Sequence, residues 1–170
     1  MSNTSNAARI LRLAMTGLVL TCSAAGAAEP TTMVKIISES GAQRVIEAAR
    51  QAAESLKAPC AIAVVDPSGI LVSFERMDGV RAGSPDLAIG KARTSALLQR
   101  PSEEVESNIA AGRIAFVTAG FLALRGGMPL VVNKDVVGAV GIASLSKEND
   151  VLIAKAAAQS LSDNSSGPGH

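Results

Sequence analysis

The sequence predicts an α+β domain in which helices cover one antiparallel sheet. Three longer segments carry apolar residues at helical spacing: 40–57, 84–99 and 146–161. Four apolar runs form two pairs, each joined by a few turn-forming residues: 60–65 with 70–76, and 130–132 with 136–143. Such short connections join antiparallel strands, because parallel strands need a longer crossover. The order helix, hairpin, helix, helix, hairpin, helix therefore favours one antiparallel sheet flanked by helices.

The first helix and the first hairpin follow from the residues that border them. Ser38 or Ser40 can cap the first helix, whose apolar positions are rich in alanine. The run 60–65 is apolar throughout, which is typical of a central strand buried on both faces. The segment 66–69, Asp-Pro-Ser-Gly, is a strong turn signal. Residues 70–76 then supply the returning strand.

Two further helices are predicted between the hairpins. Ser84 can cap a helix over 84–99, with Pro85 at its first position and an acidic residue in its first turn. A shorter helix is expected from about Ser102 to Ala110. Residues 114–124 fit either a helix or a strand.

The second hairpin and the last helix carry several glycines and one capping serine. Residues 126–129, Gly-Gly-Met-Pro, predict a tight loop before the hairpin, and Asn133 suits a left-handed position in its turn. Gly138 and Gly141 within the last strand predict that another backbone, a helix or a ligand approaches it closely. Ser146 can cap the final helix.

The two ends of the chain are expected to lie outside the domain. Residues 1–28 carry Arg9 and Arg12, then an apolar run, then small residues, which is the order of a secretory signal peptide. The apolar run is shorter than the roughly 20 residues of a stable membrane anchor. We expect cleavage after Ala27 or Ala28, a periplasmic or secreted protein with no membrane span after cleavage, a domain over 29–161 and a disordered tail over 162–170.

The composition excludes several functions. Basic and acidic residues are balanced, at 16 and 15, and the chain has no Trp, no Tyr and three Phe, so nucleic-acid binding is not expected. The single histidine is His170, the last residue, and no Cys/His cluster exists, so no metal site is expected. Cys60 lies in an apolar run and is interpreted as a buried small hydrophobe.

Five short motifs, in this order and spacing, resemble the GlcG/HbpS family, which also occurs as the C-terminal domain of PduO-type proteins. The motifs cover 63–69, 76–79, 88–94, 126–130 and 137–142. The resemblance extends over roughly residues 38–161. It implies a profilin-like or PAS-like fold with a five-stranded antiparallel sheet flanked by helices. It also implies a homo-oligomer and, for some members, haem binding with a link to haem degradation or redox sensing.

A haem site, or a site for a related small anionic ligand, can be sought in these motifs. Haem iron is usually held by His, Cys, Met or Tyr, so the candidate iron ligands here are methionines and one cysteine. Arg76 or Lys91 can pair with the propionates, and the backbone amides of the paired glycines can hold an anion. The candidate ligand-binding residues are Arg76, Met77, Asp78, Lys91, Thr94, Gly126, Gly127 and Met128, with Met33 and Cys60 as further iron ligands.

Two other functions compete with haem binding. A small-molecule enzyme of the lyase or isomerase type would use Lys91 as the base, Asp78 or Asp66 as its partner, and Arg76 to clamp a carboxylate. A ligand sensor without turnover would act with an extracytoplasmic sensor-protein partner. Each residue also has a structural interpretation: Asp66 in a turn, Arg76 with Asp78 as an ion pair, Lys91 on a helix surface, and the methionines in packing.

Overall fold

The computed structural model describes residues 30–162, of which residues 34–162 belong to one compact unit. The expected signal peptide and nearly all of the expected tail lie outside the described residues. Within residues 30–162, no helix is long and apolar enough to cross a membrane.

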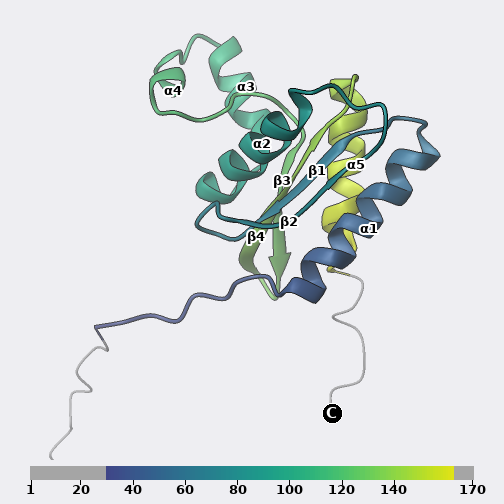
Figure 1. The fold of residues 1–170 in the computed structure, drawn as a ribbon. Helices are drawn as coiled ribbons and strands as arrows, with labels where there is room; N and C mark the ends of the chain where they lie inside the picture. The colour runs from purple at the N-terminus through teal and green to yellow at the C-terminus, as the bar shows by residue number, and fades with distance from the viewer. Residues whose placement is uncertain (1–29, 163–170) are drawn as a thin grey trace, which may run out of the picture. The chain divides into compact units, whose positions relative to one another are not determined.

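One layer of the unit consists of two helices that lie side by side on one face of the sheet, α1 (Glu39–Ser55) and α5 (Lys147–Gln159) (Figure 1). Both begin at the predicted caps. The Ser38 hydroxyl accepts a hydrogen bond from the Gly41 amide, and the Ser146 hydroxyl accepts one from the Asn149 amide. Large apolar side chains fill the space between these helices and the sheet, including Val45, Ile62 and Ile153.

The sheet within the described residues has four antiparallel strands in the order β2-β1-β4-β3. They are β1 (Ala61–Val65), β2 (Leu71–Arg76), β3 (Gly127–Val132) and β4 (Asp135–Ala143). The α+β prediction is confirmed. The fifth strand implied by the resemblance is not among the described strands, although the Ile37 amide donates to the Val137 carbonyl at 2.8 Å, as a strand neighbour would.

The opposite face of the sheet is covered by α2 (Ser84–Leu98), which packs on β1, β4 and β3. The side chains between them are small, mostly alanine, and include Ala63, Ala88 and Ala139. A Cβ added at Gly141 would overlap the Ala88 carbonyl oxygen and the backbone nitrogen of Ala92. The close approach predicted at Gly141 is therefore confirmed: α2 lies at backbone distance from β4.

The remaining helices, α3 (Ser102–Ala110) and α4 (Ala115–Thr118), follow α2 and extend away from the sheet (Figure 1). The ambiguous segment 114–124 is thus one helical turn followed by a loop. Ser84 does not cap α2, because it is the first helical residue and Gly83 occupies the capping position without a side-chain bond.

The loop predicted at 126–129 is wrong, because β3 already begins at Gly127. Two physical reasons explain the difference. β3 is an edge strand, where Pro129 costs no ladder hydrogen bond if its nitrogen faces away from β4. A Cβ at Gly127 would overlap the Lys91 carbonyl of α2, so glycine is required by the helix above the strand rather than by a turn.

Candidate functional site

Lys91 is at the centre of a buried polar network. Its Nζ donates to the Asp150 carboxylate at 2.6 Å and to the Ile142 carbonyl at 2.8 Å. The side chains of both ionic partners are only 5% exposed. Because α2 and α5 cover opposite faces of the sheet, this ion pair links the two layers at the end of β4.

Asp150 is held on its other oxygen by Ser144. Its Oδ1 accepts a hydrogen bond from the Ser144 amide at 2.7 Å and one from the Ser144 hydroxyl at 2.6 Å. The carboxylate also lies in the first turn of α5, where the helix dipole favours a negative charge. Every charge in this network is therefore compensated inside the protein, as a buried ion pair requires.

The two glycines of the fourth motif adjoin the same network. Gly126 has φ of +108°, and a Cβ there would lie 2.8 Å from the Asp150 Cβ and 3.2 Å from the Lys91 Nζ. The Gly127 amide donates to the Ser102 hydroxyl at 2.8 Å. This amide is thus used by the fold, and the expected anion contact at Gly127 would have to replace that hydrogen bond.

This geometry corrects the predicted partners of Lys91, which pairs with Asp150 and not with Asp66 or Asp78. Asp66 instead closes the first hairpin, since its Oδ1 accepts hydrogen bonds from the Ser68 and Ile70 amides at 2.8 and 2.9 Å. A general base needs a free lone pair with which to accept a proton, whereas the Lys91 Nζ makes both of its contacts as a hydrogen-bond donor. The network therefore supports a structural role for Lys91.

The structure gives Arg76, Asp78 and Thr94 different surroundings. The Arg76 guanidinium donates to the Val80 carbonyl at 3.0 Å and so closes the loop after β2, in which Asp78 is exposed. The Thr94 hydroxyl accepts a hydrogen bond from the Leu122 amide at 2.9 Å. Thr94 also lines a hollow of about 250 Å³ between α2 and the loop before β3.

The two methionines of the motifs differ in their surroundings. Met77 packs against the apolar side chains of both layers, and its sulfur accepts a contact from the Cys60 amide at 3.5 Å. Packing is thus the role that the structure gives to Met77. Met128 also packs against the core beneath α1 and α5, but it is half-buried on β3 and lines a surface groove as well.

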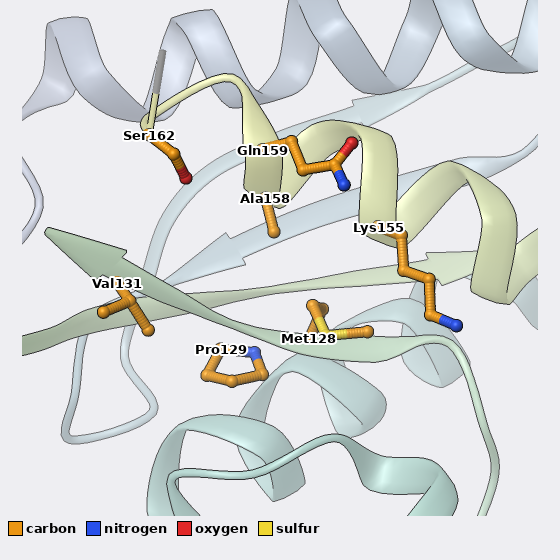
Figure 2. A pocket seen from close by; sticks show the side chains of 7 residues that line it. All are labelled: Met128, Pro129, Val131, Lys155, Ala158, Gln159 and Ser162. Carbon is orange, nitrogen blue, oxygen red and sulfur yellow. The ribbon is translucent and has the colours of Figure 1, made fainter. Parts of the chain in front are cut away.

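The groove beside Met128, which we call the β3–α5 groove, measures about 310 Å³. Figure 2 shows Met128 on the strand with Lys155 and Gln159 projecting from α5 above it. The other lining residues are Pro129, Val131, Ala158 and Ser162. The groove combines a thioether, an ammonium group and apolar walls. The sequence motifs predicted Met128 but not Lys155. Lys155 lies on the exposed side of α5, where a lysine is an ordinary surface residue and gives no signal of a site.

Cys60 is fully buried. Burial raises the pKa of its thiol to about 12, and the negative charges of Asp150 and Glu75 add to the shift. Because the thiolate is the reactive form, we expect iodoacetamide at about pH 8 to modify Cys60 only after the protein is unfolded in urea. Peptide mass spectrometry distinguishes Cys60 from Cys22, and rapid modification of Cys60 in the folded protein would contradict this assignment.

The geometry defines the class of the protein: an α+β domain with an antiparallel β2-β1-β4-β3 sheet, two helices on one face and one helix at backbone distance on the other. The family model described as "Haem degrading protein HbpS-like" matches residues 37–159. The chain belongs to this HbpS-like family, as its five motifs predict.

Individual relatives agree with this assignment. The chain is 38% identical to protein GlcG of Escherichia coli over 108 residues, which are 63% of this chain and 81% of GlcG. The crystal structure of HbpS has a TM-score of 0.72 and 28% identity, covering 83% of this chain and 96% of HbpS. The crystal structure of the PduOC:heme complex shares the fold, with a TM-score of 0.67 and 24% identity, covering 74% of this chain and 94% of that one.

Proposed function

We propose that this chain binds haem in the β3–α5 groove, with Met128 as the iron ligand and Lys155 paired with a propionate. Membership of the HbpS-like family and the haem held by the similar PduOC structure support haem as the ligand. The position of Met128 in a groove with a cationic neighbour is the observation that carries the choice of site.

The donor atoms of the chain support Met128 by comparison with the other candidates. Residues 30–162 contain no histidine and no tyrosine, and the Cys60 thiol is buried and protonated. Met77 turns its sulfur toward Cys60, inside the packing. Met33 is 96% exposed. Of these side chains, Met128 alone lines one of the described cavities, and a thioether is an accepted ligand of haem iron.

The remaining groove residues fit the other parts of a haem. Pro129, Val131 and Ala158 offer apolar contacts to the macrocycle, and the exposed Lys155 ammonium can form a charge-assisted hydrogen bond with a propionate. Lys91 is unsuited to that task, because Asp150 and Ile142 already use its protons. Bound haem would supply redox chemistry at its iron, while the chain would position it through Met128 and cover one side of it.

Replacing the proposed iron ligand tests the site. We expect hemin titrated into the protein to give a saturable Soret shift, and Met128→Ala to weaken binding by about tenfold or more and to change the Soret band. Lys155→Gln should weaken binding less, because it removes only a solvent-exposed charge contact.

Two methionine variants serve as matched controls. Met33→Ala and Met77→Ala remove the same thioether from positions that do not line the groove, and both should keep the haem spectrum of the unchanged protein. Equal haem spectra for Met128→Ala and Met33→Ala would show that Met128 is not the iron ligand. A response to hemin that never saturates would contradict the proposal that the protein binds haem.

We further propose that the protein is exported, forms homo-oligomers and acts with a sensor protein outside the cytoplasm. Arg9, Arg12 and the apolar run after them support export. The edge strand β2 supports assembly, since it exposes Leu71, Val72 and Phe74. The mass of the protein recovered from a periplasmic extract tests cleavage after Ala27 or Ala28, and sedimentation velocity tests assembly.

A further inference from the structure

A second groove lies where the chain enters α1, on the side of the sheet that α1 and α5 cover. It measures about 390 Å³ and is separate from the β3–α5 groove in its lining residues. We call it the α1 groove. Its apolar lining includes Ile36, Ile37, Val137 and Leu161. Of these, Ile36 is 63% exposed, whereas the other three lie almost entirely within the packing.

The charges of the α1 groove have one sign. Its described lining contains two cations, Lys35 and Arg44, and no carboxylate. Lys35 is already engaged, since its Nζ lies 2.6 Å from the Asp135 carboxylate. Arg44 has no hydrogen bond and no ion pair with any residue between 30 and 162. The groove thus pairs an apolar floor with one exposed guanidinium that makes no ion pair with residues 30–162.

We infer that the α1 groove binds a free single-chain amphiphile with a carboxylate head. The planar Arg44 guanidinium matches a carboxylate and can donate two parallel hydrogen bonds to it. The alkyl chain would lie against Ile36, Ile37 and Leu161, where it removes the exposed surface of Ile36 from water. A polar anion would gain nothing from this floor, and an uncharged apolar ligand would gain nothing from Arg44.

Isothermal titration calorimetry of the purified protein with decanoate, below its micellar concentration, tests the inference. We expect saturable binding at one site per chain. Decyltrimethylammonium, which has the same tail and the opposite charge, should not bind this site. Equal binding of the two amphiphiles would show that the apolar floor acts alone and would overturn the role of Arg44.

Matched variants locate the site. Arg44→Gln should weaken decanoate binding by about tenfold, the effect of losing a charge-assisted hydrogen bond near the surface. Arg81→Gln removes an exposed cation that lines none of the described cavities and should have no effect. Ile36→Asp should also weaken binding, whereas Ile70→Asp, at a position with the same 63% exposure, should not.

The outcomes separate this inference from the proposed haem site. Arg44→Gln should leave the hemin titration unchanged, because Arg44 does not line the β3–α5 groove. Absence of saturable decanoate binding, or equal losses in Arg44→Gln and Arg81→Gln, would overturn the inference whatever hemin does. Loss of decanoate binding in Met128→Ala would place the amphiphile in the other groove and overturn the location.

Discussion

Lys91→Met is expected to lower the free energy of unfolding by about 3 to 5 kcal/mol, the usual cost of removing one partner of a buried ion pair. The cost arises from the Asp150 carboxylate, which would stay buried at 5% exposure without its cation. It is a large part of the about 5 to 15 kcal/mol by which natural domains are stable. Urea denaturation followed by circular dichroism measures the change.

Two further variants show whether the ion pair is the cause. Lys155→Met removes an exposed ammonium and should change stability by no more than about 0.5 kcal/mol. Adding Asp150→Asn to Lys91→Met removes the stranded charge, so the double variant should recover part of the loss. If Lys91→Met and Lys155→Met have equal stabilities, the network does not stabilise the fold as described.

Gly141→Ala is expected to destabilise the protein by about 3 kcal/mol, near the upper end of the usual cost of overpacking. The added methyl group would overlap backbone atoms of α2 at Ala88 and Ala92, and a helix backbone cannot rotate away as a side chain can. The loss must also exceed the entropic gain of about 0.5 to 1 kcal/mol that alanine brings over glycine.

Gly83→Ala is the matched control for this substitution. Gly83 has φ of −83°, and a Cβ there would meet no atom within 4 Å. Gly83 is the N-cap residue of α2, where alanine is less favourable than glycine, so its replacement should lower the midpoint of thermal unfolding only slightly and far less than Gly141→Ala does. Equal midpoints for Gly141→Ala and Gly83→Ala would show that α2 can move away from β4 without cost.

Local signals predicted the parts of the fold that local interactions determine. Ser38 and Ser146 cap helices through bonds that span three residues, and Asp66 closes its turn through bonds that span two and four. The continuous apolar run of β1 is buried along its whole length, as a central strand requires. Each of these features depends on neighbours in the sequence, so the sequence could predict them.

Features that depend on distant elements were missed. Gly127 and Pro129 resemble turn residues, yet they lie in β3 because α2 comes close on one side and because the strand is at the edge. Lys91 and Asp150 are 59 residues apart in the sequence, and no local sequence signal identifies either residue as the partner of the other. A buried lysine requires a partner, but the choice of partner depends on where α2 and α5 meet the end of β4.

The close packing of α2 on the sheet also determines where the domain can bind a ligand. Atoms of the helix backbone occupy the space above Gly127 and Gly141 that side chains would otherwise occupy, so this layer has no spare volume to open. Both grooves considered as binding sites instead involve the side of the sheet that carries larger side chains. There, trimming one residue creates room without moving a helix. New ligand specificities are therefore easier to obtain on that side, while the alanine and glycine positions opposite stay fixed.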